Sequence, residues 1–297
     1  MTAEILIQNI MNGLALGCSY ALVAIGYTMV YGIIRLINFA HSNIFTMSMF
    51  FTYILLSLLG IYWLPGYIIA ICLTALLGVS TDAIAYRPLR NVPRVQSFVS
   101  AVAVSYILEN LMVIIFGARP KSFPIPEFLK GSTYIGSINI PIINIAIVLV
   151  MAVCLVGLYF LLFRSDAGRA MRAMSSDFDT ARLMGVNVNK TIRMTFIIGS
   201  SLAAVAGFMY GAKYPQVTPY VAAMPGMKAF VAAVFGGIGN VFGATIGGII
   251  IGLIEILFVA FFPNLSGYRD AISFIILIVV MLYMPNGLLG SRDKVKV

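Results

Sequence analysis

The sequence predicts an all-α polytopic membrane protein with about eight hydrophobic segments. Hydrophobic residues make up 61% of the 297 residues and charged residues only 10%, whereas a soluble domain carries about 25% charged residues. Long apolar runs reach the ~20 residues that a helix needs to cross a bilayer. Basic residues are concentrated in alternate connections between these runs, as expected for loops sorted to the two sides of a membrane.

Eight regions meet the length requirement for a membrane span. They follow one another along the chain without a large polar domain, so we expect a single transmembrane domain over residues 1–297. In chain order the regions are Ile5–Tyr31, Leu36–Gly60, Ile61–Tyr86, Ser97–Gly117, Pro141–Phe163, Thr195–Lys213, Lys228–Phe262 and Tyr268–Pro285.

The basic residues predict the orientation of these spans. Of the nineteen Lys and Arg residues, thirteen fall in one set of connections and six in the opposite set. Because basic loops stay in the cytoplasm, the richer set is expected inside, with the N-terminus outside and the C-terminus cytoplasmic. The thirteen inner residues are Arg35, Arg87, Arg90, Arg94, six residues from Arg164 to Arg193, Arg292, Lys294 and Lys296.

The seventh region is predicted to contain a broken, re-entrant hairpin. The predicted orientation places Lys213 and Tyr268 on the same side of the membrane. The chain between them, residues 228–262, must therefore enter the membrane and return to the side from which it started. At ~1.5 Å per residue this needs one short limb. We expect a half-helix near 230–235, a turn at the glycines Gly237 and Gly239, and a longer helix near 243–262. Such breaks commonly lie beside transport pathways.

The composition excludes several kinds of chemistry. No GxxxxGK[ST] segment is present, so any ATP must be hydrolysed by another polypeptide. His41 is the only histidine, and the chain offers no nucleophile–base–carboxylate set or clustered metal ligands. The net charge of +9 is an orientation signal and does not indicate nucleic acid binding. We therefore expect no catalytic site or cofactor in the chain, and these absences argue against a membrane enzyme.

The polar segment from Arg164 to Arg193 is predicted to be a cytoplasmic coupling loop with two short helices. Asp166 is a candidate N-cap for the first helix, over 167–174. Ser176 or Asp177 can cap the second, over 178–184, which Gly185 ends. This second helix would place Phe178, Ala181 and Met184 on one side, a pattern that suits docking into a groove on a soluble partner. An ordinary solvated loop is the alternative.

Polar residues inside or beside the spans are candidates for a translocation path. The segment 31–43 carries Asn38, His41 and Ser42 between two apolar helices; these residues either anchor the span at the headgroups or line a cavity. Glu109 and Glu255 lie well inside their spans, where an isolated carboxylate costs at least ~2.5 kcal/mol. They either contact a coupling proton or a substrate amine, or form structural hydrogen bonds.

Motifs along nearly the whole chain resemble the LivH-type permeases, which are membrane subunits of branched-chain amino acid ABC importers. The residues that carry this resemblance are Asn12–Gly17, Tyr20–Leu22, Ile25–Gly32, Ile37–His41, Ala85–Arg90, Gly168–Ala173, Gly185, Thr195–Phe196, Ala203–Gly207, Gly226–Phe230, Gly236–Gly239 and Met284–Leu288.

The resemblance implies an ABC importer permease fold in a prokaryotic inner membrane. It implies two ATPase subunits, a second homologous permease and an extracytoplasmic substrate-binding protein as partners, with the lipid bilayer around the spans. Asp179-Thr180-Ala181 followed by Gly185 is similar to the EAA-like coupling element of the family, although Asp and Thr replace Glu and Ala. The implied ATPase-coupling residues are Gly168, Arg169, Arg172, Phe178, Asp179, Ala181 and Gly185.

One departure from the family pattern bears on the substrate. His41-Ser42-Asn43 stands where the family usually has His-Gly-Glu, which removes a flexible glycine and a charge. The implied cargo is leucine, isoleucine or valine, and urea or a short amide is the alternative because related permeases carry those. An ion-coupled secondary transporter that uses Glu109 and Glu255 is a further alternative.

Overall fold

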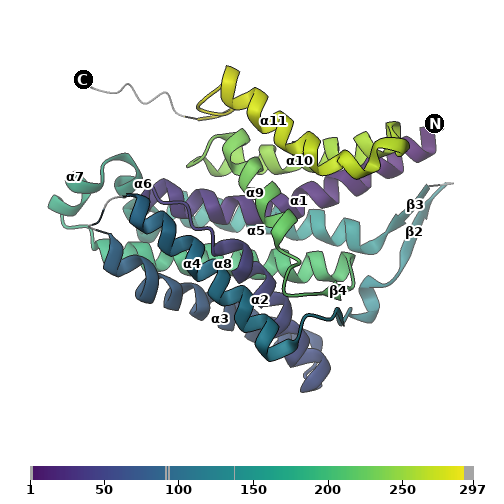
Figure 1. Cartoon of the computed structure of the whole chain (residues 1–297), viewed down its shortest axis with the longest axis horizontal. Coiled ribbons are helices and arrows are strands. Elements are labelled where there is room, and N and C mark those ends of the chain that lie inside the picture. The colour runs from purple at the N-terminus through teal and green to yellow at the C-terminus, as the bar shows by residue number, and fades with distance from the viewer. Residues whose placement is uncertain (1–2, 91, 93, 137, 291–297) are drawn as a thin grey trace.

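The computed structural model describes residues 3–90, 92, 94–136 and 138–290 and is almost entirely helical (Figure 1). Within this part of the chain, seven helices are long and apolar enough to cross a membrane, which confirms an all-α polytopic membrane protein. The α-helices are α1 (Ala3–Ile34), α2 (His41–Tyr53), α3 (Trp63–Thr81), α4 (Arg94–Phe116), α5 (Ile142–Arg164), α6 (Asp166–Ser176), α7 (Phe178–Leu183), α8 (Val188–Lys213), α9 (Ala223–Gly236), α10 (Val241–Phe261) and α11 (Arg269–Tyr283).

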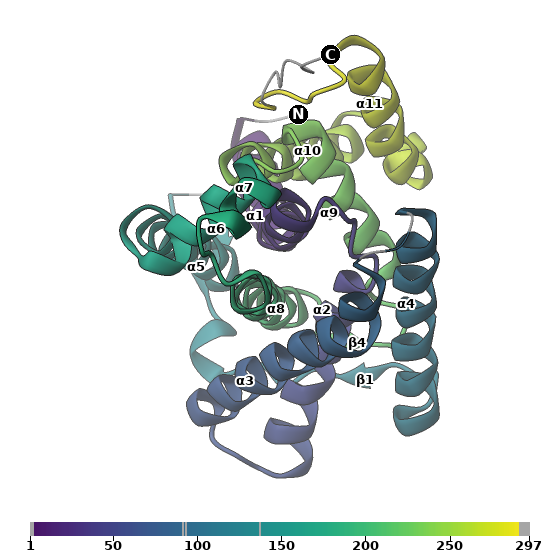
Figure 2. The same ribbon diagram turned by 90° about the vertical axis from the view of Figure 1, so that its left-hand side faces the viewer.

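Helix α1 lies at the centre of the bundle and is surrounded by α8, α9, α10 and α2, with α5 on one flank (Figure 2). Helix α11 lies outside α9 and α10, and α3 packs along α8. Four short strands add two antiparallel pairs. Strand β1 (Lys121–Ser122) pairs with β4 (Gln216–Val217), and β2 (Ser132–Ile135) pairs with β3 (Ile138–Pro141). Strands β2 and β3 lie at the end of the bundle where α1 begins, opposite to α6 and α7 (Figure 1).

Small residues let α1 and α10 approach each other closely. A Cβ atom added to Gly252 of α10 would overlap the backbone of Gly17 in α1, and one added to Gly248 would overlap Ala21. This contact between small residues is the usual means by which membrane helices associate. It explains why the glycine-rich second limb of the seventh region packs on the central helix.

A side chain at this crossing is expected to destabilise the fold. Gly252→Val would push against backbone that cannot move aside, and overpacking of this kind costs about 1–3 kcal/mol. The matched control is Gly157→Val in α5, where an added Cβ meets nothing within 4 Å. Thermal unfolding of both purified variants in detergent checks this, and equal midpoints would contradict the tight crossing.

The broken segment is confirmed. Helix α9 ends at Gly236, residues 237–240 form the turn, and α10 returns from Val241. Gly237 and Gly239 adopt φ values of 106° and 99°, which only glycine adopts readily. The first limb is longer than expected, since α9 has 14 residues where about six were predicted. It still spans only ~21 Å, less than a full membrane crossing.

The chain after α11 folds back over this turn. The N–H groups of Leu288 and Leu289 donate to the carbonyl oxygens of Phe235 and Gly236, at 2.9 and 3.0 Å. The Asn240 side chain donates to the Leu289 carbonyl at 2.8 Å and accepts from two N–H groups at the start of α10. The turn is therefore covered by protein, as non-helical backbone at membrane depth requires.

The second predicted span differs from expectation. Residues 35–40 are not helical, and α2 begins only at His41. Arg35 has a φ of 58° and interrupts the helical path after α1. The α-helix has 13 residues and continues as a π-helical turn over Ile54–Leu58. The predicted region is therefore a short, polar helix and is not among the seven long apolar ones.

Candidate functional site

The corner between α5 and α6 is tight. The Ser165 hydroxyl accepts a hydrogen bond from the Gly168 N–H at 3.0 Å and donates to the Leu161 carbonyl. A side chain at Gly168 would overlap the carbonyls of Leu161 and Leu162. Ser165 is thus the N-cap of α6, so the prediction that Asp166 caps this helix was wrong. Asp166 instead pairs with Arg169 on the exposed side.

Arg172 points back from α6 towards the bundle. Its guanidinium lies over the Phe163 ring, 5.0 Å from the centroid, in cation–π geometry. Met171 and Met174 of the same helix are buried. Helix α6 is therefore packed against the membrane-spanning helices and is not a freely solvated segment.

Helix α7 is short and well terminated. Asp177 is its N-cap and accepts from the Thr180 N–H at 2.9 Å and the Thr180 hydroxyl at 2.8 Å. Gly185 follows the helix with a φ of 87°. Asp177 is one of the two predicted caps, and Gly185 follows the helix as predicted, because a capping side chain and a left-handed glycine are strong local signals. The helix ends at Leu183, one residue earlier than expected.

The exposed face of α7 differs from the predicted one. Ala181 is buried at 5% exposure, whereas Leu183 and Met184 are 86% and 81% exposed and Phe178 is 36% exposed. Asp179 is exposed as well. The helical spacing placed Ala181 with Phe178 and Met184 but missed Leu183. The apolar surface available for docking is therefore formed by Leu183, Met184 and part of Phe178, and we call it the α7 tip.

The cap of α7 is expected to weaken in acid. The hydrogen bonds from the Thr180 N–H and hydroxyl hold the pKa of Asp177 below its ordinary value of 3.8. The stabilisation is therefore complete above the unfolded value and is lost as the pH falls through the lowered one. Hydrogen-exchange protection over 178–183 should drop between pH 6 and pH 3.

Two comparisons isolate this effect. Asp177→Asn keeps a capping oxygen but cannot titrate in this range, so its protection should not change with pH. Helix α6 is capped by Ser165 and serves as an internal reference. Equal pH dependence in the wild type and Asp177→Asn would contradict a titrating cap.

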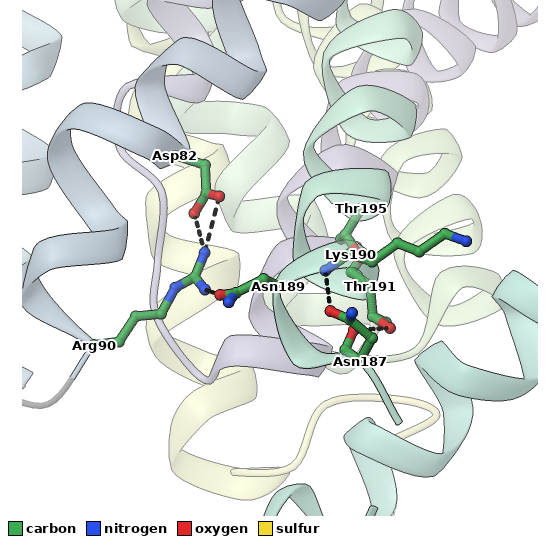
Figure 3. A network of polar contacts seen from close by, with 7 residues as sticks. All are labelled: Asp82, Arg90, Asn187, Asn189, Lys190, Thr191 and Thr195. Carbon is green, nitrogen blue, oxygen red and sulfur yellow. Dashed lines mark hydrogen bonds and ion pairs between the residues drawn. The ribbon is translucent and has the colours of Figure 1, made fainter. Parts of the chain in front are cut away.

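A polar network fixes the start of α8 directly after the α7 tip (Figure 3). Arg90 binds both carboxylate oxygens of Asp82, at 2.6 and 2.8 Å, and donates to the Asn189 side chain at 2.8 Å. Asn187 caps α8 by accepting from the Lys190 N–H at 3.0 Å. The loop after α3 and the chain after α7 are thereby linked through one arginine.

Of the candidate path residues of the segment 31–43, Asn38 and His41 are buried and Ser42 is half-buried, close to where α1, α2 and α9 meet. The Tyr86 hydroxyl donates to the Asn38 side chain at 2.6 Å. The His41 ring sits beside Gly26 of α1, with its centroid 4.9 Å from that of Tyr27, and its Nε2 has no hydrogen-bond partner within the described residues. Ser42 lies against Gly226 of α9 and donates to the Phe39 carbonyl.

Glu255 belongs to a buried ion-pair cluster. Lys228 of α9 places its Nζ 2.7 Å from Glu255 of α10 and 2.6 Å from Asp270 of α11. The Tyr20 hydroxyl of α1 donates to Glu255 at 2.9 Å, and Arg269 lies 3.8 Å from the same carboxylate. Lys228 is 2% exposed and the Glu255 side chain 4%.

This cluster corrects the placement of Lys228. Lys228 is one of the six basic residues that the charge count assigned to the outer set of connections, whereas the structure buries it within the bundle. The expected half-helix began near residue 230, whereas α9 begins at Ala223 and includes Lys228. The partners Asp270 and Tyr20 were missed as well, because they are distant in sequence. One signal in the sequence could have indicated this cluster. Lys228 and Glu255 both fall in apolar segments, and charged side chains within a membrane usually pair with one another.

Glu109 lies apart from this cluster on α4 and is half-buried. No hydrogen bond or ion pair involves its side chain within the described residues. One turn earlier, the Asn43 side chain donates to the Ser105 carbonyl and hydroxyl at 2.7 Å. The two predicted carboxylates are therefore not neighbours, and they do not form a relay.

Comparisons with known proteins agree with this architecture. Residues 9–281 match the family described as "Branched-chain amino acid transport system / permease component". The chain is 39% identical to the high-affinity branched-chain amino acid transport system permease protein LivH of Salmonella typhimurium, with 98% of this chain and 97% of that protein covered. LivH of Escherichia coli K12 shows the same identity and coverage.

A third relative is the permease protein BraD of Pseudomonas aeruginosa, which is 37% identical with 98% of both chains covered. The family match covers residues 9–281, which include all or most of each of the seven helices that are long and apolar enough to cross a membrane. This protein belongs to the family of permease components of branched-chain amino acid transport systems.

Proposed function

We propose that the chain is a permease subunit of an ATP-driven importer and that its cargo is leucine, isoleucine or valine. The α7 tip is the observation that supports coupling to an ATPase. Leu183 and Met184 are exposed at the end of the bundle opposite to the β2–β3 pair, on a rigidly capped helix. An exposed apolar tip on a packed loop suits insertion into a groove of a soluble protein.

The proposed coupling unit is the loop 164–193 within a single permease domain of residues 1–297. Gly168 allows the tight corner, Arg172 joins α6 to Phe163, and Gly185 ends α7. Two separate ATPase subunits would bind the α7 tips of this chain and of a second, homologous permease. Their closure would move α7 as a lever, and Arg90 would pass the movement to α3 and α8.

The proposed orientation places α6, α7 and the C-terminus in the cytoplasm of a prokaryotic cell and the N-terminus outside its inner membrane. It rests on the thirteen basic residues in the connections of one side. The β2–β3 end would then face an extracytoplasmic substrate-binding protein. This arrangement requires no nucleic acid, catalytic residue or cofactor in the chain.

The proposed path residues differ in how the structure supports them. Glu109 is half-buried on α4 and has no hydrogen-bond or ion-pair partner among the residues that the structure describes, which suits a surface that a second permease covers. Gly237 and Gly239 form the break, at the end of the bundle where α6 lies, which would be the cytoplasmic end in the proposed orientation. Asn38, His41 and Ser42 lie in the crossing of α1, α2 and α9, and they would respond when these helices shift. The ion pairs of Glu255 favour its structural alternative.

The substrate assignment comes from the relatives, whose names specify branched-chain amino acids. The test is uptake of labelled leucine, urea and acetamide by the assembled complex in proteoliposomes that contain ATP. We expect uptake of leucine that survives collapse of ion gradients and stops without ATP. Uptake of urea or acetamide alone would contradict the substrate, and gradient-driven uptake without ATP would contradict the mechanism.

A further inference from the structure

A polar cavity of about 490 Å³ lies between α1, α5, α6 and the start of α10. It is at the end of the bundle that faces the viewer in Figure 2, where α6 lies in front of α1 and between α5 and α10. Its walls carry two guanidinium groups, from Arg35 and Arg172, and the side chains of Ser175, Ser176 and Asn240. The described residues that line it include no Asp or Glu.

Arg172 is the group that most needs a ligand here. None of its guanidinium nitrogens has a hydrogen-bond partner within the described residues; Nη1 is buried, the residue as a whole is half-buried, and the group lies over the Phe163 ring. A buried donor of a charged group without an acceptor is costly. Arg35 donates to the Ser175 carbonyl at 3.2 Å, which keeps that guanidinium at the same wall.

A smaller recess of about 90 Å³ adjoins this cavity and shares Arg172, Ser175 and Val241 with it. Thr28 of α1 lines this recess, and its hydroxyl is fully buried without a hydrogen-bond partner within the described residues. The α10 helix also begins at the cavity, at Val241, and the positive end of its dipole adds to the potential there. These features favour an anion with several acceptor oxygens.

Apolar side chains border the same cavity. Phe163, Phe242 and Leu289 line it and are 45%, 48% and 44% exposed. A free anion would leave this apolar rim uncovered, whereas a lipid would lay its acyl chains on it. Planar guanidinium groups bind phosphate oxygens in a bidentate manner, and basic pockets between membrane helices on the cytoplasmic side bind anionic headgroups.

We propose that this cavity binds the phosphate group of an anionic phospholipid, with Arg172 as its main ligand. The assignment of this lipid to the cytoplasmic leaflet rests on the proposed orientation, whereas the binding of the lipid does not. A lipid held here would join α6 to the glycine turn and to α10, so it would brace the coupling loop against the broken helix.

The test uses the purified full-length permease without its partners, so failure of ATP coupling cannot affect it. Delipidated protein is titrated with phosphatidylglycerol, phosphatidylcholine or inorganic phosphate, and bound ligand is measured by native mass spectrometry. We expect retention of phosphatidylglycerol, with affinity reduced on the order of tenfold in Arg172→Gln because a charge-assisted hydrogen bond is lost. Arg164→Gln, an exposed residue at the end of α5, is the matched control.

Arg172→Lys keeps the charge and covers the case in which Arg172→Gln does not fold; it should retain binding but more weakly than the wild type. Equal binding of phosphatidylglycerol by the wild type and both variants would overturn the proposal. Equal retention of phosphatidylcholine would overturn the selectivity for an anionic headgroup. Binding of inorganic phosphate that depends on Arg172, without retention of lipid, would overturn the lipid as the occupant.

Discussion

Lys228→Met is expected to destabilise the folded permease by about 3–5 kcal/mol, the usual cost of removing one partner from a buried ion pair. Lys228 neutralises Glu255 and Asp270 at 2.7 and 2.6 Å, and its side chain is 2% exposed. Without it, the buried Glu255 would lose its closest cation, and only the exposed Arg269, 3.8 Å away, would remain within the described residues to compensate its charge. Three helices, α9, α10 and α11, lose their common contact at the same time.

The measurement is the thermal unfolding midpoint of purified variants, together with the yield of protein from membranes. Lys130→Met is the matched control, because Lys130 forms an ion pair with Glu127 that is exposed on both sides. Adding Glu255→Gln to Lys228→Met should recover part of the loss, since one uncompensated charge disappears. A Lys228→Met variant as stable as the control would show that the cluster does not hold these helices together.

Leu183→Asp and Met184→Asp are expected to abolish coupling without affecting the fold. These side chains are 86% and 81% exposed, so a charge costs nothing in the isolated permease but is desolvated in an ATPase groove. Loss of an apolar anchor costs at least ~2 kcal/mol, so assembly should weaken by roughly thirtyfold or more. ATPase activity stimulated by the substrate-loaded binding protein should disappear with it.

The matched control is Val95→Asp, which places the same charge on an apolar side chain that is 72% exposed in the first turn of α4, outside α7 and between two predicted spans. It should assemble and hydrolyse ATP like the wild type. Ala181 is not a suitable probe, because its side chain faces the protein at 5% exposure and a larger residue there would disturb the packing of α7 itself. Stimulated ATPase activity that survives both aspartate variants would remove α7 from the mechanism.

Features that depend on neighbouring residues in the chain were predictable from the sequence. The apolar runs, the alternation of basic connections between the two sides and the glycines at 237 and 239 were sufficient to predict the broken seventh segment. Asp177 and Gly185 likewise specify both ends of α7, since a cap and a left-handed residue act within one turn.

Features that depend on packing between distant segments were not predictable. The burial of Lys228 requires Glu255, Asp270 and Tyr20 to converge from three other helices, and periodicity within one helix contains no such information. The exposed side of α7 was wrong for the same reason, because contacts with the rest of the bundle turn Ala181 inward. The late start of α2 follows from the left-handed backbone of Arg35, which has a φ of 58°. The sequence did not indicate this break, because Arg35 is neither a glycine nor a proline.

The most direct test of an ATP-driven permease is a photo-cross-link from the α7 tip in the assembled complex. A benzophenone amino acid in place of Met184, which is 81% exposed, reacts only with protein that touches this position. The account predicts a cross-link to an ATPase subunit that changes in yield when ATP binds. A cross-link to the extracytoplasmic binding protein, or none to any subunit of an active complex, would contradict both the coupling role of α7 and the proposed orientation.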